Sequence, residues 1–169
     1  MDLKSGYPFW AVSSGLMQAF PRLASDHRCD VAVLGGGITG ALIADEQASH
    51  GFDVAILEQR DIGWGSTAAS TALLQYEIDT HLVDLAKRHG EADAALAYRA
   101  CADAIDQLHA VASAWRDVGF TRNASLYYAS RARDLKDLQR ELDARKTHAL
   151  PVEWIAGDAL WHDYGVRSE

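Results

Sequence analysis

The 169-residue sequence predicts an α/β fold organised around one parallel βαβ unit. A nearly continuous apolar run at residues 30–34 leads into a glycine-rich turn, and a segment with helical periodicity follows. A second apolar run, residues 53–57, is closed by the acidic Glu58. Parallel strands covered on both faces read as continuous apolar runs, and they need a crossover connection between them. These three observations therefore predict a strand, a helix and a parallel strand, in that order.

Residues 1–28 precede this unit and contain several aromatic side chains, including Tyr7 and Trp10. They lack a basic segment followed by a clean apolar one, so a signal peptide is not predicted. We expect an aromatic arm that packs on the body of the domain. Within the unit, apolar residues at helical spacing predict a helix over 38–50, and Gly51 is placed to cap its C-terminus.

The chain after the second strand is predicted to be mainly helical. Residues 61–71 form a loop of small residues, and Glu77 and Asp79 are placed to cap a helix that begins near Thr80. Two short apolar runs are typical of strands in a second domain. The expected elements are helices over 81–89, 92–118 and 132–148, strands over 126–129 and 152–155, and a last helical turn capped by Asp158.

The composition of the chain limits its possible functions. It has 16 basic and 24 acidic residues, and the net charge of −8 disfavours nucleic-acid binding. The two cysteines, Cys29 and Cys101, form no C-x-x-C pair, so neither a metal site nor a disulfide framework is indicated. No apolar run is long enough to span a bilayer. We therefore expect a cytoplasmic protein with reduced thiols and no metal.

Gly35, Gly37 and Gly40 fit the pattern G-x-G-x-x-G between the first strand and the helix. The first glycine permits a tight turn, the second leaves room for a pyrophosphate against bare backbone, and the third lets the helix pack closely on the strand. The N–H groups and the dipole at the helix start favour phosphate. The pattern predicts a dinucleotide site, in which Gly36 adds freedom without being essential. A glycine-rich turn that serves packing alone is the alternative.

Glu58 lies 23 residues after Gly35, at the carboxyl end of the second predicted strand. A carboxylate at this place accepts hydrogen bonds from ribose hydroxyls and repels a 2′-phosphate. The spacing therefore favours FAD or NAD over NADP. Arg60 is close enough to leave NADP open.

The loop G-W-G-S-T-A-A-S-T, residues 63–71, bears on the choice between FAD and NAD. Its small residues let the backbone approach a second phosphate or a ribityl chain, and its hydroxyls can donate hydrogen bonds. An NAD site does not need such a loop directly after the acid, so the loop favours FAD. A helix N-terminus capped by Ser66 or Thr67 is the alternative interpretation, and it does not exclude contact with a flavin.

Together, C-D-V-A-V-L-G-G-G-I-T-G-A and V-A-I-L-E-Q-R-D-I-G-W-G-S-T-A-A-S-T resemble the FAD-dependent oxidoreductases of the D-amino-acid oxidase and glycine oxidase superfamily. The resemblance implies a Rossmann-like FAD-binding unit, with pyrophosphate at the glycine-rich turn, adenosine ribose at Glu58 and the flavin end along the small-residue loop. Residues 59–76 contain no histidine for covalent attachment, so non-covalent FAD is expected. The implied cofactor-binding residues are Gly35, Gly36, Gly37, Ile38, Thr39, Gly40, Glu58, Gln59, Arg60, Gly65, Ser66, Thr67, Ser70 and Thr71.

The resemblance also implies a reaction, the oxidation of an amine or amino-acid substrate by hydride transfer to flavin N5. Members of the superfamily are about twice as long as this chain, and the groups that contact substrate are expected in their later half. No catalytic residue and no oligomeric state are predicted for this reason. A non-catalytic dinucleotide-binding remnant and an NAD-linked dehydrogenase fragment are the alternatives.

On this basis the chain is predicted to be an N-terminal portion with four parts. Residues 1–28 form the arm, 29–76 the FAD-binding segment, 77–118 a helical segment, and 119–169 the incomplete start of an α+β substrate domain. An unfinished sheet of this kind leaves an open edge and uncovered apolar surface.

Overall fold

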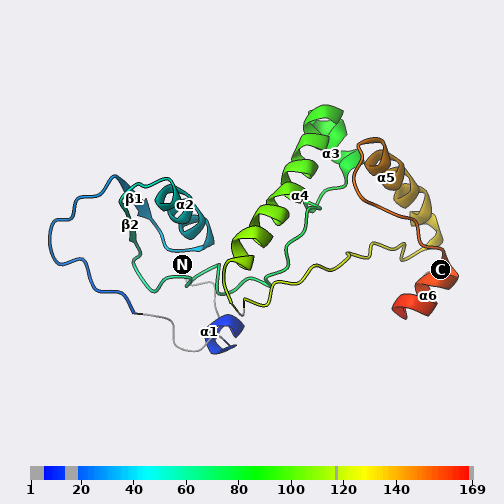
Figure 1. Cartoon of the computed structure of the whole chain (residues 1–169). Coiled ribbons are helices and arrows are strands. Elements are labelled where there is room, and N and C mark those ends of the chain that lie inside the picture. The colour runs from blue at the N-terminus through cyan, green and yellow to red at the C-terminus, as the bar shows by residue number, and fades with distance from the viewer. Residues whose placement is uncertain (1–5, 14–18, 117, 168–169) are drawn as a thin grey trace. The chain divides into compact units, whose positions relative to one another are not determined.

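The computed structural model describes residues 6–13, 19–116 and 118–167. The chain divides into two compact units, Met1–Leu73 and Leu74–Glu169. The fold is mixed α/β: the first unit holds a small parallel sheet, and the second is helical in its described part. Figure 1 labels the α-helices and strands of both units.

The first unit contains the predicted βαβ arrangement. Strand β1 (Val31–Leu34) leads into helix α2 (Ile38–Ser49), and strand β2 (Val54–Leu57) follows. The two strands pair in parallel, in a register that sets Val31 opposite Val54. Helix α2 packs on both strands (Figure 1). The predicted order of strand, helix and strand is confirmed, because each element is specified by the residues within it.

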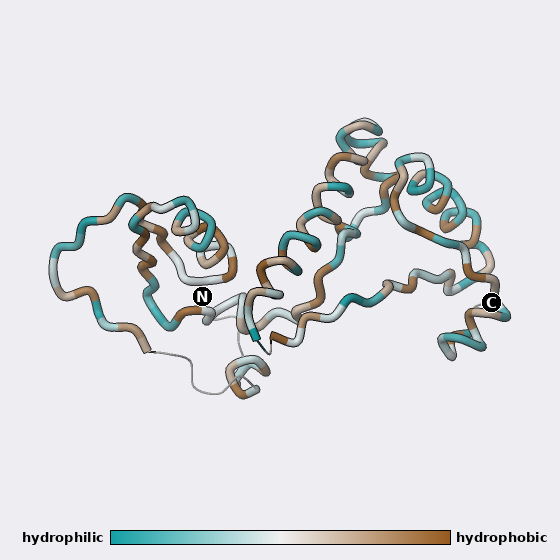
Figure 2. The backbone as a smooth tube through the Cα atoms, viewed as in Figure 1, coloured by the Kyte–Doolittle hydropathy of each residue, from teal (hydrophilic) through white to brown (hydrophobic). Residues whose placement is uncertain are grey.

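The two strands keep much of their apolar surface exposed. Val33 is buried, whereas Leu34 is 80 % exposed and Leu57 is 38 % exposed. Figure 2 shows hydrophobic residues along both strands. Parallel sheets in α/β proteins are normally covered on both faces. The described part of the first unit therefore leaves the uncovered apolar surface that the sequence predicted.

The aromatic arm contacts the first unit through Trp10. Its indole Nε1 donates a hydrogen bond of 2.9 Å to the carbonyl oxygen of Ser70. Trp10 lies in a short helix that the sequence did not predict, α1 (Phe9–Ser13). Phe20 is 62 % exposed, so the arm packs less closely than expected. Residues 14–18, also part of the predicted arm, lie outside the described residues.

The second unit is built from helices around one apolar cluster. Helices α3 (Leu82–His89) and α4 (Glu91–Ser113) meet at Gly90, and α3 also packs against α5 (Leu135–Thr147). Gly90 has φ +90°, a value that glycine adopts without strain, so the chain can turn sharply between the two helices. The core residues are Leu82, Ala94, Tyr98 and Leu150. The remaining elements are the 3₁₀ helix η1 (Ala132–Asp134) and helix α6 (Gly157–Tyr164).

Both strands predicted for the second unit are wrong. Residues 126–129 and 152–155 are irregular, and the described part of this unit contains no strand. A strand needs a neighbouring segment that accepts and donates its backbone hydrogen bonds, and the described chain supplies none beside these two segments. Tyr127 and Tyr128, in the first of these segments, are both exposed. The β component of the expected substrate domain is therefore not confirmed.

Helix α4 ends at Ser113, earlier than the predicted end at residue 118. The Ser113 hydroxyl donates back to the carbonyl oxygen of His109 at 2.7 Å, a bond that competes with helical continuation. Trp115, two residues beyond the end of this helix, is 67 % exposed. None of the helices in the described chain is both long enough and apolar enough to cross a bilayer.

The start of α3 is stabilised by a carboxylate from a distant helix. Glu141 of α5 is 2 % exposed and accepts the N–H groups of Leu82 at 2.8 Å and Val83 at 3.1 Å. Arg145, one turn further along α5, donates to Glu141 at 2.8 Å and to Glu77 at 3.1 Å. The carboxylate satisfies two N–H groups that have no partner within their own helix, and its charge is balanced by Arg145.

This arrangement corrects the prediction that Glu77 and Asp79 cap the helix near Thr80. Glu77 instead pairs with Arg145 and accepts a hydrogen bond from Ser125 at 2.8 Å. The cap comes from Glu141, which is 59 residues after Leu82 in the chain and lies outside the local pattern around Thr80.

The buried network also shifts the ionisation of its members. Burial alone lowers the pKa of the Arg145 guanidinium, but the hydrogen bond and charge of Glu141 raise this pKa overall. Burial raises the pKa of Tyr98 to about 12, and its hydroxyl donates to the carbonyl oxygen of Thr80 at 2.6 Å. At neutral pH Arg145 is therefore charged and Tyr98 is neutral.

Candidate cofactor site

The glycine-rich turn between β1 and α2 is held tightly against the sheet. The Gly35 N–H donates to the carbonyl oxygen of Leu57 at 2.8 Å, which continues the pairing of the two strands. Gly40 lies so close to Gly35 that a Cβ atom at position 40 would overlap the Gly35 carbonyl oxygen. The predicted close approach of helix and strand at Gly40 is therefore present in the structure.

Gly36 has a more specific place than the sequence pattern indicated. It is buried, and a Cβ atom here would overlap the Ile62 side chain and lie 3.2 Å from the Glu58 Cβ. Its N–H donates to Glu58, and its carbonyl oxygen accepts from Gly63 at 2.7 Å. Gly63 was expected only as part of the small-residue loop, and Ile62 was not predicted as a site residue. The available signal for Ile62 was an apolar residue directly after the polar residues 59–61.

Glu58 at the end of β2 points at this turn. One carboxylate oxygen accepts the Gly36 N–H at 2.8 Å, and the other accepts the Arg60 N–H at 2.9 Å. These two hydrogen bonds, the Gly36 bond first, hold the pKa of Glu58 below its usual value, so the group is ionised at neutral pH. A carboxylate has about four acceptor positions. About two of them are left for the hydroxyls of a ligand.

The small-residue loop folds back onto the glycine-rich turn. The Thr67 hydroxyl oxygen accepts the Ile38 N–H at 3.0 Å, and the Arg60 guanidinium lies 3.1 Å from the position of a Cβ on Gly65. Residues 62–69 consist of turns, so no helix begins here for Ser66 or Thr67 to cap. Thr67 bonds instead to the start of α2. Two parts of the sequence, about 30 residues apart, thus form one site.

Other hydroxyls of the loop are used locally. The Ser70 hydroxyl accepts the Ala72 N–H at 3.2 Å, and the Thr71 hydroxyl accepts the Leu73 N–H at 3.4 Å. Both therefore serve turns of their own segment. The structure brings together the residues Gly35, Gly36, Gly37, Ile38, Gly40, Glu58, Arg60, Gly65 and Thr67, whereas Thr39, Gln59 and Ser66 are exposed beside them.

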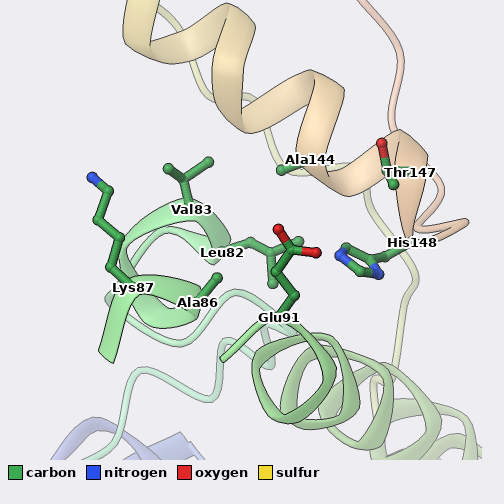
Figure 3. Close-up of a pocket in the computed structure, with 8 residues that line it drawn as sticks. All are labelled: Leu82, Val83, Ala86, Lys87, Glu91, Ala144, Thr147 and His148. Carbon is green, nitrogen blue, oxygen red and sulfur yellow. The ribbon is translucent and has the colours of Figure 1, made fainter. Parts of the chain in front are cut away.

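The second unit has a cavity of its own. It has a volume of about 400 Å³ and is lined by α3, by the start of α4 and by the end of α5. Figure 3 shows Glu91, His148 and the apolar side chain of Leu82 among the residues that line this cavity. It contains no residue predicted to bind a cofactor. Across the described ranges, no three His, Cys, Asp or Glu side chains gather in a way that could hold a metal ion.

The parallel βαβ unit, the close-packed glycine-rich turn and the acid aimed at that turn define a Rossmann-like dinucleotide-binding arrangement. The family model of FAD dependent oxidoreductases (DAO) matches residues 30–167. The chain belongs to this family.

Individual relatives carry names from several oxidoreductase activities. Glycine oxidase of Geobacillus kaustophilus is 30 % identical over 139 residues, which are 79 % of this chain and 34 % of the relative. Gamma-glutamylputrescine oxidoreductase of Escherichia coli is 35 % identical over 78 residues, 45 % of this chain and 18 % of the relative. YhfW of Bacillus subtilis, a protein named for a Rieske 2Fe-2S cluster, is 35 % identical over 103 residues, 61 % of this chain and 20 % of the relative.

The chain spans about a third or less of the length of these relatives. No solved structure matches it.

Proposed function

We propose that this chain forms the dinucleotide-binding part of an FAD-dependent enzyme that oxidises an amine or an amino acid. The observation that carries the proposal is the Glu58 carboxylate, which is hydrogen-bonded to Gly36 and faces a glycine-rich turn at the start of α2. Membership of the FAD-dependent oxidoreductase family supports FAD as the dinucleotide.

The names of two relatives support the substrate class. The match to glycine oxidase extends over 79 % of the chain and therefore includes much of the second unit. Matches to glycerol-3-phosphate dehydrogenases, such as the mitochondrial protein of Saccharomyces cerevisiae, cover only 31 % of this chain or less. The longer match favours oxidation beside a nitrogen atom over oxidation of an alcohol.

The residues of the first unit fit an adenine dinucleotide. The bare backbone of the glycine-rich turn and the positive end of the α2 dipole suit the diphosphate, while the free acceptor positions of Glu58 suit the adenosine ribose. When bound, FAD supplies a ring that accepts a hydride from substrate. This part of the chain would bind and orient the cofactor, and we assign no catalytic residue to it.

The proposal is tested by the visible spectrum of the purified full chain. After incubation with FAD and removal of free cofactor, we expect retained absorption bands of a bound flavin. Acid precipitation is expected to release the flavin into the supernatant, because the proposed site has no covalent attachment. A chain that retains ADP-ribose or NAD but no FAD would overturn the proposal in favour of an NAD-linked protein. A chain that retains none of these ligands would also contradict it.

Glu58→Ala is expected to weaken the binding of FAD and of ADP-ribose by roughly fivefold to a hundredfold, since a charged hydrogen-bond acceptor for the ribose is lost. Isothermal titration calorimetry on the full chain measures both affinities. Glu46→Ala is the matched control, because Glu46 is an exposed acid on α2 in the same unit. Equal affinities of Glu58→Ala and of the unaltered protein would remove Glu58 from the ribose site.

A further inference from the structure

The aromatic arm is joined to the small-residue loop by the side chain of Trp10. This residue lies in α1, and its indole Nε1 donates to the carbonyl oxygen of Ser70, 60 residues further along the chain, at 2.9 Å. Its ring meets that of Phe9 edge to face, with the ring centroids 4.9 Å apart. Trp10 is 36 % exposed, whereas Phe9 is 69 % exposed. Of these two aromatic residues, Trp10 is therefore the one that attaches α1 to the loop.

This hydrogen bond lies beside a strained part of the backbone. Ala72 has φ +57°, in the left-handed region that residues with a Cβ atom seldom adopt. The Ala72 N–H donates to the Ser70 hydroxyl at 3.2 Å, and the Ser70 N–H donates to the Thr67 carbonyl oxygen at 3.3 Å. Of these three hydrogen bonds at Ser70, the one from Trp10 comes from outside the loop. A strained conformation persists when the surrounding structure fixes it, and Trp10 supplies part of that structure.

The same loop is attached to the glycine-rich turn at its other end. The Gly63 N–H donates to the Gly36 carbonyl oxygen at 2.7 Å. The loop is thus fixed to the turn at its start and to α1 near its end. In the proposed function the diphosphate lies at the turn and the flavin end lies along the loop. The attachment at Ser70 therefore acts on the part of the site that differs between FAD and ADP.

We propose that Trp10 is a positioning residue for the flavin end of the cofactor. By fixing the Ser70 carbonyl group, it holds residues 66–72 in the conformation that receives the cofactor. Less of the loop then has to be ordered when the ligand binds, which favours binding. The inference rests on the proposed function and extends it, because it makes the arm a part of the cofactor site.

The first test compares the binding of FAD with that of ADP, which lacks the flavin end, on full-length variants. Trp10→Phe keeps an aromatic ring and removes the N–H donor. We expect it to weaken FAD binding by roughly threefold to tenfold, the effect of one neutral hydrogen bond, and to change ADP binding by less than about a factor of two. Trp115→Phe is the control, because it makes the same substitution at an exposed position of the second unit. Isothermal titration calorimetry measures both affinities.

Two further measurements examine the loop itself. Without ligand, we expect faster hydrogen–deuterium exchange over residues 69–73 in Trp10→Phe than in the unaltered protein, and unchanged exchange over residues 31–57. Ala72→Gly relieves the strain, since glycine adopts a positive φ freely. Adding Ala72→Gly to Trp10→Phe is therefore expected to restore part of the lost FAD affinity.

The outcomes separate this inference from the proposed function. Failure of the unaltered protein to bind FAD would overturn both, whatever the exchange data show. Normal FAD binding in the unaltered protein with the same affinity in Trp10→Phe would overturn only the role of Trp10. An equal loss of ADP and FAD binding would show that Trp10 merely supports the fold of the unit, and would also overturn the inference. Unchanged exchange over residues 69–73, or a double variant that binds FAD no better than Trp10→Phe, would likewise contradict it.

Discussion

Gly40→Ala is expected to lower the stability of the βαβ unit by about 3 kcal/mol and to abolish measurable binding of FAD and ADP. The added methyl group would overlap the Gly35 carbonyl oxygen, which belongs to the backbone and cannot rotate away as a side chain can. Helix α2 must then move away from β1, and the N–H groups at its start lose their alignment. Hydrogen–deuterium exchange measured over residues 31–57 reports the loss of stability, and calorimetry reports the loss of binding.

Gly157→Ala is the matched control for this substitution. Nothing lies within 4 Å of the position that its Cβ would take, at the first residue of α6, so we expect unchanged exchange over residues 31–57. Normal exchange protection and FAD affinity in Gly40→Ala would contradict the close approach of helix and strand on which the site depends.

Glu141→Ala is expected to lower the free energy of unfolding of the second unit by about 3–5 kcal/mol. The substitution leaves Arg145, which is only 7 % exposed, with Glu77 as its remaining carboxylate partner. It also leaves two N–H groups at the start of α3 without an acceptor. Urea unfolding followed by circular dichroism measures the change, because this unit contributes most of the helical signal.

Two further variants serve as the control and the rescue for this prediction. Asp143→Ala removes an exposed acid from the same helix and is expected to change stability by less than about 0.5 kcal/mol. Adding Arg145→Met to Glu141→Ala removes the stranded charge and is expected to recover part of the loss. A single variant Glu141→Ala as stable as Asp143→Ala would show that the buried carboxylate contributes little.

The βαβ unit could be predicted from the sequence because the residues that specify it lie within its own segments. The glycines, the apolar runs and Glu58 each specify their own backbone, and the two strands begin at Val31 and Val54, one residue after the predicted starts. The spacing from Gly35 to Glu58 also placed the acid near the glycine-rich turn, since parallel neighbouring strands end at the same edge of a sheet, although the hydrogen bond to Gly36 was not predicted. The glycine-rich turn and Glu58 lie together for this reason.

The sequence did not predict the role of residues whose structure depends on a partner far away in the chain. The apolar run at 126–129 has the composition of a strand, but a strand forms only beside a second segment. Thr67 reaches the start of α2 through a loop whose path no periodicity describes. Glu141 reads as one more polar residue of an amphipathic helix, although it is nearly inaccessible to solvent. In each case the decisive contact is tertiary.

The contact between Leu82 and Glu141 has a consequence for the order in which the second unit matures during translation. The acceptor for the first α3 amide protons is encoded 59 positions downstream. At typical elongation rates of about 5–20 residues per second, the ribosome adds it roughly 3–12 s after the α3 amides are made. Over that interval the nascent segment has to rely on water for those bonds. Docking of α5 onto the start of α3 therefore cannot begin until residue 141 has been made.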